Sequence, residues 1–378
     1  MARSGSAGNW SNMSDPRVLG IDIGGANIKA ATVCGESAAV RFSLWREPDR
    51  LAEQLLGIAS RCAPCDAWAV TMTGEMADCF PCRADGVLSL VASTRAAADA
   101  LGIRDLTFYR VDGRFVQADG AVCDPLPIAS ANWHALAAWV ATLIDSPALL
   151  IDVGGTTTDI IPLEPQTPSS LGSGDRGVAT SSRTDFDRLV AGQLVYLGGE
   201  RTPVCAVVDA LPYGDGGVPV MREVFANLDD CALVLGLGEE HPHDRESCDG
   251  QPRTAAAAKN RLARMIGLDG SAVEPAAASR MARAVVAAAA AALIRGIAAQ
   301  PRRHVGRWIL SGHAAEYFLP DLQTAFRDTR VERLSERVGR ARSRGAPAVA
   351  CAALRAAELT FQATARLRDL DASRENSR

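Results

Sequence analysis

Two stretches of the same design, GIDIGGANIK at residues 20–29 and LIDVGGTTTDI at residues 150–160, decide the fold of this chain. In each, an apolar, β-branched run leads to an aspartate and paired glycines, and a second run with apolar residues follows. This pattern predicts two β-strands joined by a tight turn. Because it recurs, we interpret it as an internal repeat with a domain boundary near Ser146-Pro147. Plain tight turns are the alternative, but they would have to arise twice at the end of a buried strand.

Around these two hairpins, segments with strand and helix periodicity alternate. Helices are predicted at residues 49–61, 130–144, 254–266, 275–299 and 348–362, and strands at residues 68–73, 202–209, 231–235 and 307–311. The alternation predicts an α/β protein. We expect disordered tails at 1–16 and 367–378, an N-terminal domain at 17–146 and a C-terminal domain at 147–366, whose last helix can pack back on the first domain.

The composition favours a small ligand over a macromolecular partner. The chain has 378 residues, of which 48% are hydrophobic, and its formal net charge is −4, so two α/β domains with their own cores fit its length. The sequence contains no cluster of basic residues interleaved with aromatics, which is the pattern that would predict nucleic-acid binding. The apolar segment 275–299 contains Arg283 and Arg295, which favours a packed helix and not a membrane span.

The cysteines and the start of the chain predict a cytoplasmic protein. Ten cysteines are present, and residues 1–15 contain no apolar run like that of a signal peptide. Reduced thiols in a cytosol are therefore expected. A homo-oligomer is compatible with this sequence, which does not decide the oligomeric state.

The glycine turns are candidate phosphate-binding loops. Glycine can adopt positive φ and bring backbone N–H groups close to phosphate oxygens, and neighbouring hydroxyl and amide side chains can add donors. The candidate phosphate-binding residues are Gly24, Gly25, Asn27, Gly154, Gly155, Thr156, Thr157, Thr158 and Gly312.

Three charged residues accompany the turns. Asp22 and Asp152 would repel bare phosphate, but their carboxylates suit a hydrated Mg²⁺ ion that bridges them to it. Lys29 follows the first turn, and Lys259 is the only other lysine in a chain whose remaining basic residues are arginines. We expect Lys29 to supply positive charge to the phosphate, and Lys259 to be incidental.

The two turns resemble the phosphate loops of the actin, Hsp70 and acetate/sugar kinase superfamily, and LSGHAAEYFL at residues 310–319 resembles its later nucleotide-contact turn. The resemblance implies two ribonuclease-H-like domains with a ligand cleft between them. A narrower resemblance, to the hydantoinase/oxoprolinase-like proteins of the tetrahydromethanopterin-linked one-carbon pathway, covers nearly the whole ordered chain. It is carried by DIGGANIK, MTGEMADCF (72–80), ANWHALA (131–137), YLGGERTPVCA (196–206) and DGQPRTAAAAKNRLARMIG (249–267). The chain departs from the family pattern at 237–250 and in a Ser/Gly-rich run after Pro162, which we interpret as an insertion.

The narrower resemblance implies a transferase of methanofuran biosynthesis. In that reaction the phenol of a tyramine- or tyrosine-type acceptor displaces diphosphate from an aminomethylfuran-methyl diphosphate and forms an aryl ether. Lys29, backbone N–H groups and Mg²⁺ would stabilise the departing diphosphate. No organic cofactor is needed, and which acceptor is used stays open.

Four further side chains are candidates for the substrate site. Glu75 and Asp78 follow a strand at its carboxyl end, where α/β folds place their sites, and either carboxylate could take the proton of the phenol. A charge at a helix N-terminus is the alternative for Glu75. Arg201 could bind diphosphate or an acceptor carboxylate, or be a surface arginine. Asn132 could bind substrate beside His134, or cap a helix.

Two further patterns resemble metal sites, and we favour neither. Cys62-x-x-Cys65 and Cys79-x-x-Cys82 have the spacing of structural zinc ligands, but the residues between the pairs belong to a predicted strand and turn. His241, His243 and Asp244 lie in a polar loop. Two other functions fit the glycine turns as well: an ATP-dependent kinase or hydantoinase-like ATPase, with ATP as ligand, and a non-catalytic nucleotide switch.

Overall fold

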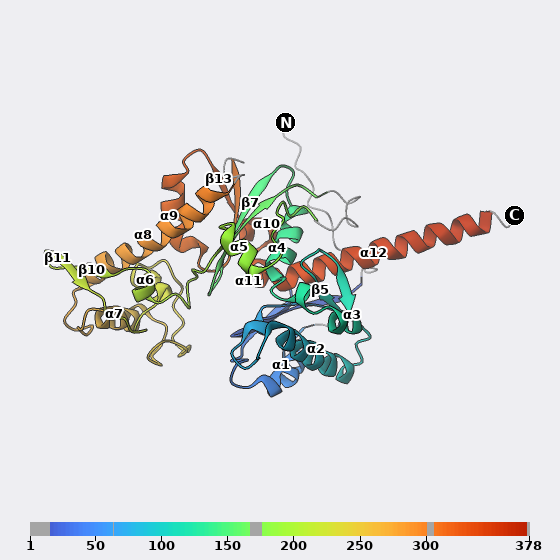
Figure 1. Cartoon of the computed structure of the whole chain (residues 1–378), viewed down its shortest axis with the longest axis horizontal. Helices are drawn as coiled ribbons and strands as arrows, with labels where there is room; N and C mark the ends of the chain where they lie inside the picture. Colours follow the sequence, from blue (N-terminus) through green and yellow to red (C-terminus); the bar gives the residue numbers. More distant parts are fainter. Residues whose placement is uncertain (1–15, 63, 167–175, 301–305, 376–378) are drawn as a thin grey trace. The chain divides into compact units, whose positions relative to one another are not determined.

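The computed structural model of the protein describes residues 16–62, 64–166, 176–300 and 306–375 (Figure 1). These residues form two compact units that are each assembled from separate parts of the chain. The first unit comprises Met1–Ser146, Leu163–Ala179 and Val338–Arg378, and the second comprises Pro147–Pro162 and Thr180–Arg337. Nearly all of the predicted N-terminal tail and part of the predicted Ser/Gly-rich insertion lie outside the described residues.

The first unit is built on a six-stranded sheet in the order β3-β2-β1-β4-β5-β6. β1 pairs antiparallel with β2 and parallel with β4, and β4 continues parallel to β5. The strands are β1 (Val18–Ile23), β2 (Asn27–Thr32), β3 (Ser37–Arg41), β4 (Ala67–Met72), β5 (Asp105–Tyr109) and β6 (Phe115–Gln117). Every residue of β1 and β4 is buried, as expected for central strands covered on both faces.

Helices cover both faces of this sheet. One face carries Ile21 and Val70 into a core shared with α1 (Leu51–Ala59) and α2 (Arg83–Ala100). The other helices are α3 (Ala118–Cys123), α4 (Asn132–Ala141), α11 (Arg340–Arg344) and α12 (Ala346–Glu375). α12 packs on β1, β2, β4 and α4. It comes so close that a Cβ atom on Gly20 would lie 1.8 Å from the carbonyl oxygen of Ala348.

The second unit repeats this plan with a five-stranded sheet in the order β13-β12-β7-β8-β9. β7 pairs parallel with β12, which pairs parallel with β13. The strands are β7 (Ala148–Val153), β8 (Thr158–Leu163), β9 (Leu194–Val195), β12 (Arg307–Ser311) and β13 (Arg330–Arg333), and β10 (Ala210–Tyr213) and β11 (Gly216–Pro219) form a separate two-stranded sheet. Read as β9-β8-β7-β12-β13, the strands of this sheet correspond one by one to β3-β2-β1-β4-β5 of the first unit. This is the strand order of ribonuclease-H-like domains, so the predicted fold class and the predicted repeat are confirmed.

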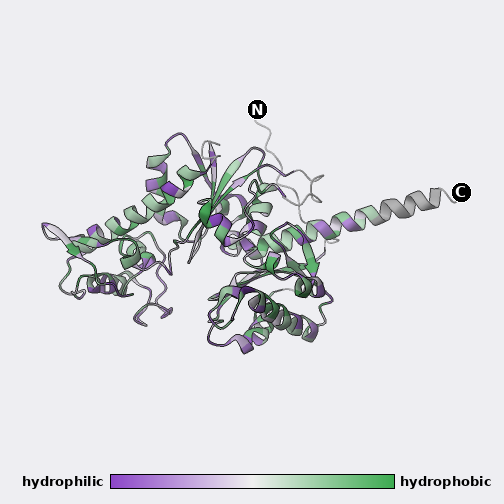
Figure 2. Cartoon of the chain, viewed as in Figure 1, coloured by the Kyte–Doolittle hydropathy of each residue, from purple (hydrophilic) through white to green (hydrophobic). Residues whose placement is uncertain are grey.

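The core of the second unit is organised around one long helix. The helices are α5 (Asp185–Val190), α6 (Leu228–Val234), α7 (Ala255–Arg264), α8 (Pro275–Ala299), α9 (Ala315–Ala325) and α10 (Leu334–Val338). Among the described residues, one helix, α8, is long enough and apolar enough to cross a membrane, judged by length and composition alone. Its residues Met281, Val285 and Leu293 are fully buried in the core of this unit, as predicted for a packed helix. Figure 2 shows that buried strands such as β7 are mainly hydrophobic.

Several predicted elements differ from those in the structure. Residues 231–234 belong to helix α6 and Leu235 is its C-cap, because Asn227 and Asp230 form a capping box that starts a helix there. Residues 202–209 contain a short 3₁₀ turn, Val204–Ala206, and no strand. Residues 163–166 and 176–179, which the sequence-based division assigned to the C-terminal domain, lie in the first unit. The last helix packs on the first unit, as that division allowed. α12 runs on to Glu375 through part of the predicted disordered tail, which is rich in helix-forming residues.

Candidate functional site

Both glycine turns have the same local geometry. The Gly24 N–H donates to the carbonyl oxygen of Asn27 at 2.9 Å, and the Gly154 N–H donates to that of Thr157 at 2.9 Å. None of the four turn glycines, all of which are described, has a positive φ, so that part of the prediction was wrong. Glycine is needed at Gly24 because a Cβ atom would lie 2.9 Å from the Asn27 carbonyl oxygen. Around Gly25 no atom lies within 4 Å of a Cβ position, which leaves open space above the turn.

Asp22 lies at the end of β1 in a row of three side chains across neighbouring strands. Lys29 of β2 and Thr71 of β4 are its register partners on the two sides. Asp22 is only 8% exposed, and burial raises the pKa of its carboxyl to about 6, although the charge of Lys29 acts in the opposite direction. Asp22 and Lys29 were predicted from the sequence, but Thr71 was not, because it lies in a strand whose pattern is that of a buried core strand.

This row fits a hydrated Mg²⁺ ion. Asp22 Oδ1 and Thr71 Oγ1 are buried, and neither has a hydrogen-bond partner among the described residues. Such groups are costly to leave unsatisfied in a folded protein, so a missing partner with affinity for oxygen is expected beside them. Carboxylate and hydroxyl oxygens are the ligand types that Mg²⁺ and its water shell prefer.

Glu75 lies in the short 3₁₀ turn Gly74–Met76 and is enclosed. Its side chain has no exposed area, and its Oε1 accepts hydrogen bonds from Ser130 Oγ at 2.7 Å and from an Arg83 guanidinium nitrogen at 3.2 Å. Burial raises the pKa of Glu75, and these two partners lower it in part. Ser130 reaches it from a backbone with a φ of 49°, an uncommon conformation for a serine. Asp78, by contrast, is exposed.

Glu75 lies in the first turn of the 3₁₀ helix Gly74–Met76, as the alternative of a charge at a helix N-terminus required, but its side chain is buried and not solvated. α2 begins at Arg83, and Cys82 caps it by accepting a hydrogen bond from the Asp85 N–H. A Cβ atom on Gly86 would lie 2.3 Å from the carbonyl oxygen of Glu75, so the first turn of α2 packs directly on the Glu75 backbone. Glu75 therefore ties the turn after β4 to Arg83 and Ser130.

The second glycine turn differs from the first in its side chains. Thr158, predicted to bind phosphate, is fully buried, and its hydroxyl donates to the carbonyl oxygen of Leu197 at 2.8 Å, so it serves the fold. Thr156 and Thr157 are half-buried and make no side-chain hydrogen bond among the described residues. Asp159 occupies the place that Lys29 has in the first repeat and pairs with Arg188. The second turn therefore lacks the free cation of the first.

Asp152 and Gly312 lie at the ends of two adjacent strands. Ser311 of β12 is the register partner of Asp152, which is half-buried. Gly312 has a φ of 87°, and a Cβ atom on it would lie 2.1 Å from the carbonyl oxygen of Val153. This glycine is required for the chain to cross the end of β7.

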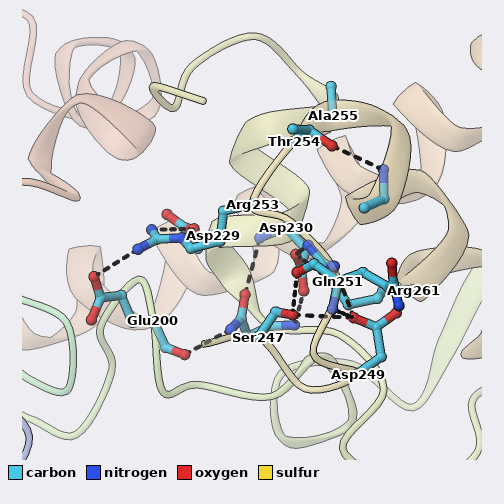
Figure 3. A network of polar contacts seen from close by, with 12 residues as sticks. Glu200, Asp229, Asp230, Ser247, Asp249, Gln251, Arg253, Thr254, Ala255 and Arg261 are labelled. Carbon is cyan, nitrogen blue, oxygen red and sulfur yellow. Dashed lines mark hydrogen bonds and ion pairs between the residues drawn. The ribbon is translucent and has the colours of Figure 1, made fainter. Parts of the chain in front are cut away.

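A network that the sequence analysis missed connects three of the quoted motifs. Arg253 of the motif at 249–267 donates to Asp229 Oδ2 at 2.5 and 3.1 Å and to Glu200 at 3.4 Å (Figure 3). It also donates to Asp244 at 3.1 Å. Glu200 belongs to the motif at 196–206. Asp229 also accepts a hydrogen bond from the Tyr317 hydroxyl at 2.6 Å, and Tyr317 belongs to the motif at 310–319.

A second arginine supports this network from inside. Arg261 is completely buried and donates to Asp230 at 2.6 and 2.8 Å and to Asp249 at 3.1 Å (Figure 3). Asp244 and Asp249 come from the stretch at 237–250 that departs from the family pattern. That stretch is therefore part of the network and not an independent loop.

The network reaches the second glycine turn through Glu200 and His313. The backbone N–H of Glu200 donates to the carbonyl oxygen of Gly155 at 2.9 Å. A Cβ atom on Gly155 would lie 3.0 Å from Glu200 Oε2 and 3.5 Å from His313 Cε1. The His313 Nε2 atom lies 3.7 Å from Glu200 Oε1, and both side chains are partly exposed. Their place within the conspicuous motifs was the only sequence signal for them.

The side chains of the two predicted substrate-binding residues, Arg201 and Asn132, have different surroundings in the structure. Arg201 is exposed, and its backbone N–H donates to the carbonyl oxygen of Gly155 at 2.9 Å. Asn132 is the first residue of α4, and its side chain accepts a hydrogen bond from the next N–H and does not cap the helix. His134 is fully buried, and its Nδ1 atom lies 2.9 Å from the hydroxyl oxygen of Tyr109. His134 therefore cannot face a ligand surface, as had been suggested.

The patterns that resembled metal sites do not form clusters in the part of the chain that the structure describes. Groups of three or more His, Cys, Asp or Glu side chains with metal-binding geometry are absent there. Cys82 serves as the cap of α2, and the Cys79 thiol donates to the carbonyl oxygen of Leu44 at 3.8 Å. His241 and His243 are exposed.

Comparisons with known proteins agree with the motifs. The sequence pattern of the Hydantoinase/oxoprolinase family matches residues 66–357. The (4-{4-[2-(gamma-L-glutamylamino)ethyl]phenoxymethyl}furan-2-yl)methanamine synthase of Methanocaldococcus jannaschii is 31% identical over 67% of this chain and 72% of the relative. The synthase of the same name from Methanococcus vannielii is 32% identical over 35% of this chain and 55% of the relative. A solved nucleotide-free structure of acetone carboxylase is 10% identical over 89% of this chain and 70% of that chain, with a TM-score of 0.48. Since the family pattern covers well over half of the sequence, the chain belongs to the hydantoinase/oxoprolinase family.

Proposed function

We propose that the protein is a transferase that joins an aminomethylfuran-methyl diphosphate to the phenol of a γ-glutamyltyramine-type acceptor in methanofuran biosynthesis. The observation that carries this proposal is the 31% identity to a synthase whose named product contains a phenoxymethylfuran. An aryl ether of this kind needs a phenol as nucleophile and a furanylmethyl carbon with a leaving group.

The proposed reaction is a displacement at that carbon. The phenol oxygen forms a bond to the methylene carbon, the bond from this carbon to the diphosphate oxygen breaks, and its electron pair leaves with diphosphate. Negative charge therefore develops on the leaving group, and preorganised donors stabilise it best.

The first unit offers suitable groups for the diphosphate. We assign its oxygens to the N–H group of Gly25, where the space is open, and to the ammonium of Lys29. The Gly24 N–H already donates to Asn27 and serves the turn itself. Asp22 and Thr71 would hold a hydrated Mg²⁺, which supplies further positive charge to the leaving group when it is bound. In the second unit, Thr156 and Thr157 at the corresponding turn can donate hydroxyl hydrogen bonds to a phosphate group, and the Asp152 carboxylate suits a hydrated Mg²⁺ in the same way.

The acceptor needs a base and an anchor. Glu75, whose buried Oε2 has no partner among the described residues, and the exposed Asp78 are the carboxylates that the sequence suggests for the proton. The exposed Arg201 can pair with an acceptor carboxylate, and Asn132 can donate an amide hydrogen bond to the acceptor.

A second candidate function, an ATP-dependent kinase or ATPase, is favoured by one observation. The same four-residue turn occurs in both units, and a turn of this kind suits the phosphates of a nucleotide as well as a diphosphate. Thermal-shift titration distinguishes the two. Under our proposal Mg²⁺ with diphosphate raises the melting temperature at least as much as Mg²⁺ with ATP at equal concentration. Stabilisation by ATP alone, with no response to diphosphate, would favour the kinase or ATPase.

A further inference from the structure

Two exposed apolar side chains of the first unit, Trp45 and Met76, border its glycine turn. Trp45 is 48% exposed and Met76 is 59% exposed. Trp45 directly follows Leu44, whose N–H donates to the carbonyl oxygen of Gly25 at 3.1 Å. Met76 ends the 3₁₀ turn that begins at Gly74, where a Cβ atom would lie 3.4 Å from the carbonyl carbon of the first turn glycine. Both side chains therefore come from segments that contact the turn.

The exposure of Trp45 is unusual for a tryptophan of this chain. The other tryptophans that the structure describes are at most 7% exposed; they are Trp68, Trp133, Trp139 and Trp308. Small-molecule sites combine aromatic and apolar side chains with a few placed polar groups. At this turn the polar groups are the Gly25 N–H and Lys29, and the apolar groups are Trp45 and Met76.

We propose that Trp45 binds the furan ring of the diphosphate substrate by stacking, with Met76 as a second apolar contact. This inference rests on the proposed transferase function and names the residue that recognises the organic part of the donor. Because consecutive Cα atoms are about 3.8 Å apart, the Trp45 side chain begins within roughly 9 Å of the Gly25 carbonyl oxygen. One small molecule can therefore reach both the turn and the indole.

The indole of Trp45 already holds a positive charge in the protein without ligand. The guanidinium carbon of Arg46 lies 4.4 Å from the centroid of the Trp45 ring, which is a cation–π contact. Arg46 is exposed, and its guanidinium makes no hydrogen bond or ion pair among the described residues. The furan ring can therefore take its place on the indole face.

This property of the indole suits the proposed displacement. As the bond from the furanylmethyl carbon to the diphosphate oxygen breaks, its electron pair leaves with diphosphate. Positive charge then develops on that carbon and is shared by the furan ring until the phenol oxygen has formed the new bond. An indole face attracts this charge most strongly while it exists, so Trp45 should raise the rate as well as the affinity for the donor.

The binding test compares wild type with Trp45→Phe, Trp45→Leu and Trp45→Ala in the full chain. Phe361→Ala removes another exposed aromatic side chain of the same unit and is the matched control. Calorimetry with Mg²⁺ present measures the affinity for two probes without acceptor, inorganic diphosphate and aminomethylfuran-methyl diphosphate. Acrylamide quenching of fluorescence is recorded with each probe, and the difference between wild type and Trp45→Phe reports Trp45 itself.

We expect Trp45→Ala to bind aminomethylfuran-methyl diphosphate about tenfold more weakly than wild type, because it loses the stacking surface. Its affinity for inorganic diphosphate should stay within twofold of wild type, and Phe361→Ala should bind both probes normally. Only the probe with the furan ring should protect Trp45 from acrylamide.

Turnover with γ-glutamyltyramine separates stacking from simple apolar contact. Trp45→Leu keeps an apolar side chain without a π-face, so it should recover part of the affinity but keep a kcat about tenfold below wild type. Trp45→Phe should recover part of both.

Three results count against the inference. If Trp45→Ala binds and converts the furan substrate within twofold of wild type, the inference is overturned and the proposed function stands. Equal losses of affinity for both probes would also overturn it, because Trp45 would then serve the turn and not the furan ring. Wild-type protein that forms no ether and binds neither probe would overturn both the inference and the proposed function.

Discussion

At the scale of single residues, the buried carboxylate of Asp22 is the clearest sign of a cation site, because its Oδ1 has no hydrogen-bond partner among the described residues. It lies between Lys29 and Thr71 at the ends of three adjacent strands. Lys29 offsets part of the desolvation, but the pKa of Asp22 is still raised to about 6. The ionised form is therefore destabilising in the protein without ligand, which leaves the site ready for a cation.

We predict that Asp22→Asn stabilises the unliganded protein at pH 7 while it weakens Mg²⁺ binding. For an acid whose pKa is raised from 3.8 to about 6, native stability is highest below pH 3.8 and is lost as the pH rises through 6. Removing the charge should return up to roughly 3 kcal/mol of unfolding free energy at pH 7. Urea denaturation of both proteins between pH 4 and 8 measures this difference.

The control for this experiment is Asp215→Asn, an equal change of charge at an exposed turn. It should leave the pH dependence of the unfolding free energy unchanged. If Asp22→Asn proves no more stable than wild type at pH 7 and binds Mg²⁺ equally well, Asp22 is neither destabilising when ionised nor a ligand of the cation.

We further predict that Lys29→Ala slows ether formation by about 2–4 kcal/mol of transition-state free energy and leaves the fold intact, because it removes a charged donor from the diphosphate. The matched control is Lys259→Ala, the other lysine of the chain, whose Nζ donates to the carbonyl oxygen of Val273 at 3.2 Å. Steady-state kinetics compares the two. Equal rates for both variants would show that Lys29 has no role in leaving-group departure.

At the scale of elements, the two glycine turns show what sequence reasoning could and could not establish. The strand, turn and strand at each site were predicted correctly, because the hydrophobic pattern and the paired glycines are local signals. The reason for the glycines was different from the one expected. Gly24 is required by contact with the Asn27 carbonyl oxygen, and Gly312, not a turn glycine, has the positive φ.

This difference gives a prediction with opposite outcomes at two glycines. Gly25→Ala should leave the melting temperature nearly unchanged, since nothing lies within 4 Å of the added Cβ, but should weaken diphosphate binding about tenfold, or 1.4 kcal/mol. Gly312→Ala should destabilise the protein by at least about 2 kcal/mol, because its φ is 87° and the Cβ would lie 2.1 Å from the Val153 oxygen. Thermal unfolding and diphosphate titration measure both effects. A folded Gly25→Ala variant with wild-type affinity would remove the first turn from the diphosphate site.

Short apolar runs were the least predictable elements. Residues 231–235 were predicted as a strand but form the end of α6 and its C-cap, since a run of this length fits either structure and the deciding Asn227–Asp230 cap lies outside it. The network around Arg253 was also beyond prediction. Its partners Asp229 and Glu200 are 24 and 53 residues away in sequence, and only the fold brings them together.

At the scale of the whole molecule, the chain builds two units with the same strand order and different chemistry. The first unit has Lys29 beside its aspartate, and the second has the pair of Asp159 and Arg188 at the equivalent place. The second unit has Glu200 and His313 beside its turn, where the first has open space. The two halves of the repeat therefore differ in the charged groups that lie beside their turns.

The incubation that tests the proposed transferase most directly contains pure protein, Mg²⁺, aminomethylfuran-methyl diphosphate and γ-glutamyltyramine, with no nucleotide. The products are analysed by mass spectrometry, and released diphosphate is quantified in parallel. The account predicts the aryl ether and diphosphate in equal amounts, with no dependence on added ATP. Absence of the ether in this mixture, together with hydrolysis of ATP when ATP is supplied, would contradict it.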